Sequence, residues 1–204
     1  MHENNFSISK EEILEAHKRI RPFIHQTPLL TSESIDQIAG CSIFFKCENF
    51  QKVGAFKMRG ATNAILQLAK EELKNGVCTH SSGNHAQAVA KAAAMIGTKA
   101  QIVMPENAPS VKIEAVKSYG GIIHFCEANL KAREDTVNRI IQDTGALFIP
   151  PFDHKDIICG QASASKEVFD AIKDLDAILC PVGGGGLLSG TILAANYSIQ
   201  NRTR

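Results

Sequence analysis

The sequence lacks the features that would direct it to a membrane, a nucleic acid or the secretory pathway. It carries 22 Lys and Arg against 21 Asp and Glu, a net charge of +1, so no charge excess predicts binding to nucleic acid or anionic membranes. No apolar run could span a bilayer, and residues 1–5 lack the basic and apolar regions of a signal peptide. These absences predict a cytoplasmic globular protein.

The six cysteines form no pattern typical of a metal site or a redox motif. None make a Cys-x-x-Cys pair, and none are spaced with histidine as zinc ligands are, so we expect no metal site in this chain. Most fall in apolar runs such as 177–180, which predicts reduced, buried thiols that pack as small hydrophobic side chains. The cysteines are Cys41, Cys47, Cys78, Cys126, Cys159 and Cys180.

Helix-like and strand-like patterns alternate along the chain, without a solenoid repeat or a low-complexity segment. Apolar periodicity predicts a helix over 10–20, a short strand over 42–47 and a helix from Lys57 to about residue 75. The alternation that follows is typical of a parallel sheet covered by helices, and so of an α/β fold. Its members are strands over 77–80, 100–104, 122–126 and 146–149, and helices over 85–96, 111–119 and 129–143.

Pro150-Pro151 marks a predicted boundary between two α/β domains. We expect residues 52–150 to form a small domain, and residues 1–51 and 151–204 to form part of a larger one. Beyond the boundary the sequence predicts a helix over 160–172, then the elements that lead into and out of a glycine loop. A ligand loop that follows the latest strand of a sheet is normally succeeded by another strand, so we expect the larger domain to be incomplete. The remaining elements are a strand over 177–182 and a helix over 187–197.

Four consecutive glycines between a predicted strand and a predicted helix indicate an anion site. Consecutive glycines let the backbone turn tightly and direct several N–H groups inward, and the helix dipole adds positive potential. No Gly-Lys-Ser/Thr follows, which excludes a P-loop, and no acidic residue lies where a dinucleotide-binding fingerprint requires it. A phosphate monoester is the expected ligand, and a flexible turn is the alternative. The loop is Gly183, Gly184, Gly185 and Gly186.

Lys57 has neighbours that favour a chemical role over that of a solvated lysine at the start of a helix. Phe56, Met58 and Ala61 provide an apolar setting, and burial lowers the pKa of a lysine and makes its amine nucleophilic. We also expect Arg59 to disfavour a second positive charge nearby. A lysine amine together with a phosphate-sized glycine loop predicts a pyridoxal phosphate site.

The polar turn Ser81-Ser82-Gly83-Asn84-His85 lies between a predicted strand and a predicted helix. Hydroxyl groups and free N–H groups at a helix N-terminus can hold a carboxylate, and Asn84 can donate to a phenolate-type oxygen. The alternative is an N-cap turn, which is compatible with the first interpretation. No potential metal partner is spaced for His85, so we expect it to orient other groups.

Three motifs in this order resemble the serine/threonine dehydratase family. These are the fold-type II pyridoxal-phosphate enzymes, similar to the β subunit of tryptophan synthase. The resemblance covers essentially the whole chain and is strongest to the branch of serine racemase, threo-3-hydroxyaspartate ammonia-lyase and catabolic threonine dehydratase. It implies two parallel-sheet α/β domains. The motifs are residues 49–61 around Lys57, residues 81–85 and residues 183–187.

The resemblance implies a role for each motif residue in holding the cofactor. Lys57 would form a Schiff base with pyridoxal 5'-phosphate, Phe56 would pack beside the ring, and Asn84 would bond the ring hydroxyl. The phosphate would lie on Gly183 to Gly186 and on Leu187.

The resemblance also implies substrate contacts. Ser81, Asn84 and His85 would hold the substrate carboxylate, and Ser82 resembles the residue that exchanges a proton on the opposite face of the ring in racemases. Arg133 resembles an arginine that contacts a second carboxylate, as a dicarboxylate such as hydroxyaspartate would require. A solvated helix arginine is an equal alternative for Arg133.

The reaction that these likenesses imply is dehydration and deamination of serine, threonine or 3-hydroxyaspartate to a keto acid and ammonia. Phe152 stands where serine racemases tend to have asparagine, which favours a dehydratase, and serine racemase is the alternative. A truncated remnant that only binds cofactor or amino acid is a third interpretation, because family members are considerably longer. In a full-length parent the family resemblance also implies a homodimer, and Mg²⁺ bound by ligands outside this chain.

Overall fold

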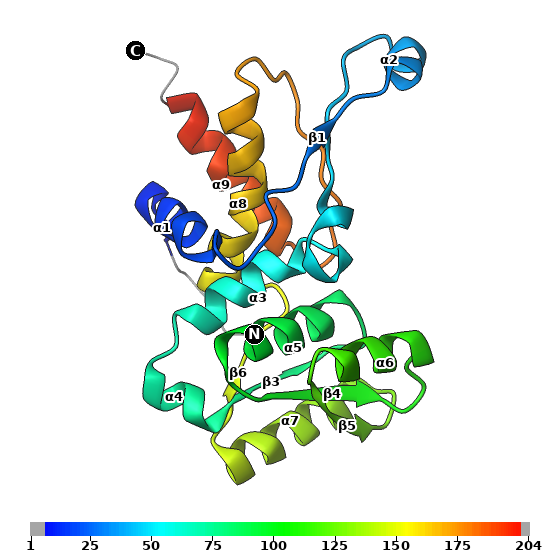
Figure 1. Cartoon of the computed structure of the whole chain (residues 1–204), viewed down its shortest axis with the longest axis vertical. Helices are drawn as coiled ribbons and strands as arrows, with labels where there is room; N and C mark the ends of the chain where they lie inside the picture. Colours follow the sequence, from blue (N-terminus) through cyan, green and yellow to red (C-terminus); the bar gives the residue numbers. More distant parts are fainter. Residues whose placement is uncertain (1–6, 201–204) are drawn as a thin grey trace.

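The computed structural model describes residues 7–200, which form an elongated molecule with a parallel sheet at one end and a group of helices at the other (Figure 1). Helix α3 (Lys57–Leu66) lies between the two ends. None of the helices in the described part of the chain is both long and apolar enough to cross a membrane.

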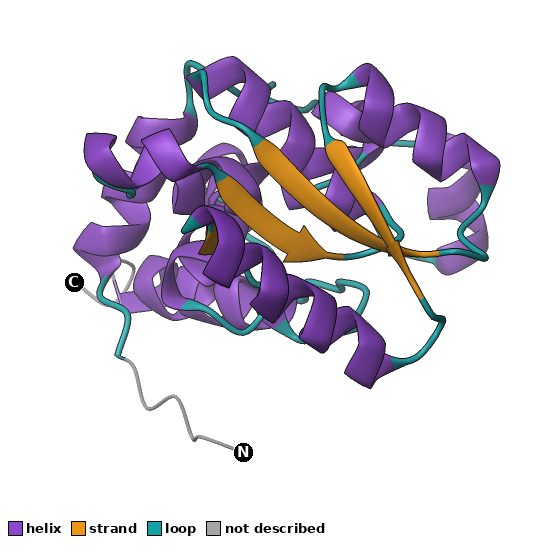
Figure 2. Cartoon of the chain, turned by 90° about the horizontal axis from the view of Figure 1, so that it is seen from below, coloured by secondary structure: helices purple, strands orange, loops and turns teal. Residues whose placement is uncertain are grey.

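The sheet has four parallel strands in the order β5-β4-β3-β6. Its core is built from side chains such as Val77, Ile102 and Met104, which are fully buried because helices cover both faces of the strands (Figure 2). Parallel strands carry their carboxyl ends to the same edge, and loops from this edge build ligand sites in α/β proteins. The strands are β3 (Val77–His80), β4 (Ala100–Pro105), β5 (Ile122–Cys126) and β6 (Leu147–Phe148).

The helices around the sheet follow the predicted order. On one face lie α5 (Asn84–Ile96) and α6 (Ser110–Ser118), and on the other lies α7 (Leu130–Thr144), which Asn129 caps through its side chain. The predicted helix from Lys57 to about residue 75 is instead two helices, because the chain turns after Leu66 before α4 (Lys70–Asn75) begins.

The other end of the molecule is a stack of helices. Helix α1 (Lys10–Ile20) begins at Ser9 with a capping box completed by Glu12. It packs against α8 (Lys155–Ala171), and α8 packs in turn against α9 (Gly186–Gln200) and α3. Helix α8 begins five residues before the predicted start at Gly160, because His154 caps it.

A short arm projects from the helical end (Figure 1). It contains the antiparallel pair β1 (Leu29–Leu30) and β2 (Phe45–Lys46), and α2 (Glu33–Ala39) between them. Two 3₁₀ turns, η1 (Glu48–Phe50) and η2 (Lys52–Gly54), then lead into α3. The predicted strand over 42–47 is therefore confirmed only in its last part.

The predicted strand over 177–182 is wrong. In the described structure this segment has no regular secondary structure and pairs with no strand, and Leu179 and Val182 are 92% and 63% exposed. An apolar run becomes a strand only where a neighbour satisfies its backbone N–H and C=O groups, and the four-stranded sheet does not extend to it.

Candidate active site

Lys57 is the first residue of α3, and its side chain is half-buried. The amine donates a hydrogen bond of 2.5 Å to the carbonyl oxygen of Pro151 and lies 5.4 Å from the centre of the Phe56 ring. Burial lowers the pKa of this amine below that of an ordinary lysine. A larger fraction of the amine is therefore neutral, and so nucleophilic, than in a solvated lysine.

Arg59 does not act on Lys57 in the way expected from the sequence, because its charge is neutralised inside the protein. Its guanidinium is fully buried and makes paired hydrogen bonds of 2.8 and 2.8 Å to Glu48 and of 2.8 and 2.9 Å to Glu167. Ser163 accepts a further bond of 3.1 Å. These bonds engage all three nitrogen atoms of the guanidinium, Nε, Nη1 and Nη2, as donors.

Lys46 completes this buried group by donating to Glu167 at 2.5 Å and to the carbonyl oxygen of Thr27 at 2.7 Å. We call Arg59, Glu48, Glu167 and Lys46 the Arg59 network. It has two positive and two negative side chains, so the charges balance. The network joins the first turn of α3, which begins at Lys57, to α8 and to the arm.

The polar turn lies between a strand and a helix, as the sequence predicted, and this places it at the carboxyl edge of the sheet. Strand β3 ends at His80, and α5 begins at Asn84. The Ser81 hydroxyl accepts a hydrogen bond of 3.2 Å from the backbone N–H of Gly83, while the Asn84 side chain is exposed. The hydroxyl groups of the turn and the first N–H groups of α5 therefore lie together at a helix N-terminus.

His85 is buried, and its hydrogen-bond partner identifies which ring nitrogen carries the proton. Its Nε2 atom lies 3.0 Å from the carbonyl oxygen of Ile149, so Nε2 carries the proton and donates. Burial, with a smaller contribution from the charge of Lys57, lowers the pKa of His85 to about 4, against the opposing bond to Ile149. The ring is neutral at pH 7, and its Nδ1 atom is buried without a hydrogen-bond partner.

The glycine loop has the open backbone that an anion site needs. Gly185 has a φ of 86°, which L side chains rarely adopt, and Gly186 is the first residue of α9. A Cβ on Gly183 or Gly185 would meet no atom within 4 Å. Within the described chain, the backbone N–H groups of Gly183, Gly184 and Gly185 donate to no protein atom. Free amides at a helix N-terminus fit a phosphate group.

Residues 150–152 bring Lys57 and the glycine loop together. The carbonyl oxygen of Pro151 accepts the bond from Lys57, and the next residue, Phe152, packs on the loop so closely that a Cβ on Gly184 would lie 2.2 Å from its ring. The two predicted parts of a pyridoxal phosphate site are therefore neighbours, although 126 residues separate Lys57 from Gly183 along the chain.

Arg133 lies further along the carboxyl edge of the sheet, on α7. Its side chain is half-buried, and its Nε atom is buried without a partner. Burial lowers the pKa of His80, and the charge of Arg133 lowers it further while Glu134 raises it. Arg133 is therefore close enough to His80, which directly precedes the polar turn, for its charge to act there.

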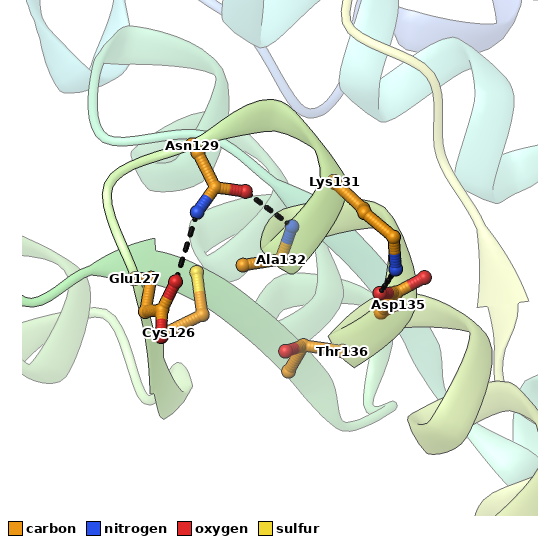
Figure 3. A pocket seen from close by; sticks show the side chains of 7 residues that line it. All are labelled: Cys126, Glu127, Asn129, Lys131, Ala132, Asp135 and Thr136. Atoms are coloured by element: carbon orange, nitrogen blue, oxygen red, sulfur yellow. Dashed lines mark hydrogen bonds and ion pairs between the residues drawn. The ribbon is translucent and has the colours of Figure 1, made fainter.

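A shallow cavity of about 410 Å³ opens at the carboxyl end of β5 (Figure 3). Asn129 reaches into it, accepts from the N–H of Ala132 at 2.7 Å and donates to Glu127 at 3.0 Å, and Lys131 forms an ion pair with Asp135 at its rim. None of the predicted site residues line this cavity, so the chemistry around Lys57 places the candidate site elsewhere.

The sequence motifs did not identify the residues that hold the first turn of α3 through Arg59. Lys46 and Glu167 are separated by 121 residues and lie on elements without a recognisable signature. Glu48 directly precedes the first motif, residues 49–61. It is therefore the one carboxylate of the Arg59 network that its place in the sequence could have suggested.

Known proteins with similar sequences point to the same cofactor. Residues 20–203 match the family model described as "Pyridoxal-phosphate dependent enzyme". The chain is 50% identical over 189 residues to a serine racemase of Dictyostelium discoideum, which covers 93% of this chain and 58% of that protein. It is 45% identical over 183 residues to a beta-hydroxyaspartate dehydratase of Paracoccus denitrificans, which covers 90% of this chain and 58% of that protein.

A crystal structure of the serine racemase from Dictyostelium discoideum has the same fold. It matches with a TM-score of 0.91 and 49% sequence identity, over 95% of this chain and 63% of that chain. The chain thus spans less than two thirds of the length of these relatives.

Proposed function

Because the chain belongs to the family of pyridoxal-phosphate dependent enzymes, of fold type II, we propose that its parent enzyme dehydrates and deaminates a small hydroxy amino acid. The products are a keto acid and ammonia, and the candidate substrates are serine, threonine and 3-hydroxyaspartate. The observation that carries this proposal is the half-buried Lys57 amine, held by a segment that also packs on the glycine loop.

The donor groups around Lys57 match the parts of pyridoxal phosphate. Lys57 would hold its aldehyde carbon, Phe56 would pack beside its ring, and Asn84 would donate to its ring hydroxyl. When bound, the cofactor supplies an electron sink for the charge left when the α-proton is removed. The phosphate would lie on the free amides of the loop, namely Gly183, Gly184, Gly185 and Gly186, with Leu187.

The chain's own residues then bind and orient the substrate. Ser81 and Ser82 offer hydroxyl groups, and the first turn of α5 offers backbone N–H groups, which together suit a carboxylate. The His85 ring is committed to Ile149, so His85 would contribute its backbone N–H to that carboxylate. A neutral Lys57 amine can accept the α-proton, because burial keeps its pKa low.

Arg133 would bind a second carboxylate if the substrate is a dicarboxylate. Its Nε donor is buried and unpartnered, and a carboxylate would satisfy it. The relative from Paracoccus denitrificans, which bears the name beta-hydroxyaspartate dehydratase, supports 3-hydroxyaspartate as the first substrate to test.

Serine racemase is the second candidate function. The 50% identity to a serine racemase favours it, and Ser82 would return the proton on the opposite face. Measuring keto acid and D-serine from L-serine separates the two activities. Replacement of Ser82 by alanine is expected to abolish formation of D-serine and to spare formation of the keto acid.

The organisation of the parent enzyme belongs to the same proposal. We assign residues 52–150 to a small domain, and residues 1–51 and 151–204 to part of a larger one. Family likeness further supports a cytoplasmic homodimer and a Mg²⁺ site with ligands outside these 204 residues. In the described residues no group of three or more His, Cys, Asp or Glu is placed to hold a metal ion.

The first experiment measures attachment of pyridoxal phosphate to the purified chain, by visible absorbance, borohydride reduction and peptide mapping. We expect one labelled peptide that contains Lys57 and no label in the Lys57→Ala variant. The matched control is Lys74→Ala, an exposed lysine in an ion pair with Glu71, which is expected to label normally. Label spread over surface lysines would show that these 204 residues do not build the cofactor site by themselves, and the function would then belong to a longer parent.

A further inference from the structure

Helices α3 and α8 cross in backbone contact at a pair of glycines. A Cβ on Gly160 would lie 2.6 Å from the carbonyl oxygen of Arg59 and 2.6 Å from the Cα atom of Gly60. Gly60 in turn donates its N–H to the side chain of Gln161 at 3.2 Å. Two helices can come this close only where neither has a side chain at the crossing.

Helices α8 and α9 cross in the same manner. A Cβ on Gly190 would lie 2.7 Å from the backbone nitrogen of Ala162 and 2.9 Å from the carbonyl oxygen of Ile158. The buried hydroxyl groups of Ser165 and Thr191 are hydrogen-bonded to each other at 2.7 Å across this contact.

The two contacts use opposite faces of α8. At about 100° per residue, Gly160 and Ala162 point roughly 200° apart, so α3 and α9 lie on either side of α8 at nearly the same height. Glu167 lies on the face of Gly160 and holds Arg59, whereas Ser165 lies on the face of Ala162 and holds Thr191.

Each crossing lies one helical turn from one half of the candidate site. Lys57 precedes Gly60 by three residues on α3, and Gly186, the last residue of the loop, precedes Gly190 by four residues on α9. We propose that α8 is a spacer that fixes the distance between the Lys57 amine and the amides of the glycine loop, with Gly160 and Gly190 as positioning residues. The proposal rests on the proposed function, since it concerns the same cofactor.

The distance matters because the cofactor must reach both halves at once. A ligand held at two points binds tightly only if the second contact costs no strain once the first has formed. Adding a methyl group at either crossing would push α3 or α9 away from α8, because the opposing atoms belong to the backbone and cannot swing aside. The Lys57 amine and the glycine loop would each keep their own structure, but the distance between them would change.

The test compares the affinities of the chain for pyridoxal phosphate and for pyridoxal, which lacks the phosphate. The ratio of the two affinities measures how much binding of the phosphate by the loop adds to attachment at Lys57. In Gly160→Ala and Gly190→Ala we expect this ratio to fall by roughly ten- to a hundredfold, while the affinity for pyridoxal changes little. Thr191→Val removes the hydroxyl pair without adding bulk, remains folded if the alanine variants do not, and is expected to lower the ratio by a smaller factor.

The matched control is Val137→Ala on α7, a buried position away from α8. Its stability falls, but the ratio is expected to stay at the wild-type value. A ratio that is unchanged in the folded variants, Thr191→Val included, overturns the spacer proposal. If instead the wild-type chain attaches neither compound at Lys57, it is the cofactor site proposed for this chain that fails, and the two results are thereby distinguished.

Discussion

The two halves of the candidate site are built in different ways. Lys57 starts a helix whose first turn is held by the Arg59 network, with buried ion pairs to Glu48 and Glu167. The glycine loop follows a segment, 177–182, that makes no strand, and its support comes from Phe152 and from the contact of α9 with α8. Both halves rest on close backbone packing against α8, but only the lysine half is also held by buried side-chain charges.

This difference has a physical basis in what each half would have to do in the proposed cofactor site. A reactive amine needs a low pKa, so its surroundings must exclude water and balance the charges nearby without moving. A phosphate site needs free backbone N–H groups, so its own residues cannot be tied up in a sheet or a side-chain network. Only the lysine half should therefore be sensitive to loss of charge partners, whereas both halves should be sensitive to added bulk.

The largest effect is expected from breaking the lysine half with Arg59→Met. Removing the guanidinium leaves Glu48 and Glu167 without their main cation, and losing one partner of a buried ion pair costs about 3–5 kcal/mol. Urea denaturation measures the loss. Lys74→Ala, which breaks an exposed ion pair with Glu71, is the control and should change the unfolding free energy by less than about 0.5 kcal/mol. Equal effects of the two variants would contradict the conclusion that the buried Arg59 network stabilises the fold more than an exposed ion pair does.

Acid should destabilise the chain through His85, which lies on α5 next to the candidate site. Its pKa is about 4 in the folded chain and about 6.5 when unfolded, so the unfolded state binds more protons between these values and stability falls as the pH drops through this window. Once the pH has fallen below both pKa values, His85 has lowered the free energy of unfolding by roughly 3 kcal/mol. Above pH 6.5 the ring is neutral in both states and contributes nothing.

His85→Gln isolates this contribution, because glutamine can also donate to Ile149 and does not titrate. Urea denaturation at pH 4 to 7 should show a shallower acid loss in the variant. Burial also lowers the pKa values of His17, His80 and His124, which remain in both proteins and cancel in the difference. Parallel pH curves for wild type and variant would refute the burial argument.

On the loop half, Gly184→Ala should have an intermediate effect through Phe152. The new methyl group would meet the aromatic ring, and overpacking of this kind costs about 1–3 kcal/mol unless the ring moves. In a Phe152→Ala background the same substitution should cost about 1 kcal/mol less, a coupling that a double-mutant cycle of unfolding free energies measures. If the effects of the two substitutions on the unfolding free energy were additive, the Phe152 ring would not contact Gly184.

The smallest expected effect is that of Ser165→Ala, which tests the contact between α8 and α9. It leaves the buried Thr191 hydroxyl without its partner and should cost about 1–2 kcal/mol. Ser198→Ala is the control on α9, since Ser198 bonds only to the Ala194 carbonyl within its own helix. A thermal melt that ranks the two variants equally would argue against a special role for the hydroxyl pair.

The elements around the sheet were predictable because their signals are local. Alternation of short apolar runs with helix-period segments placed β3 and β5 at their observed bounds, and the other strands within two residues. The same reasoning failed at 177–182, since an apolar run carries no information about whether a neighbouring strand is present. It also failed at Arg59, whose neighbours in sequence suggested repulsion from Lys57 while its neighbours in space are carboxylates.

By itself, the sequence determined the chemistry: a lysine in an apolar setting, a polar turn at a helix start and a glycine loop, in the order typical of this enzyme family. The tertiary structure decided how these parts meet. Pro151 and Phe152 join Lys57 to the loop, Ile149 selects the proton position of His85, and α8 separates α3 from α9. The physical reason is that backbone preference and apolar period act over a few residues, whereas burial, charge pairing and helix spacing depend on segments a hundred residues apart.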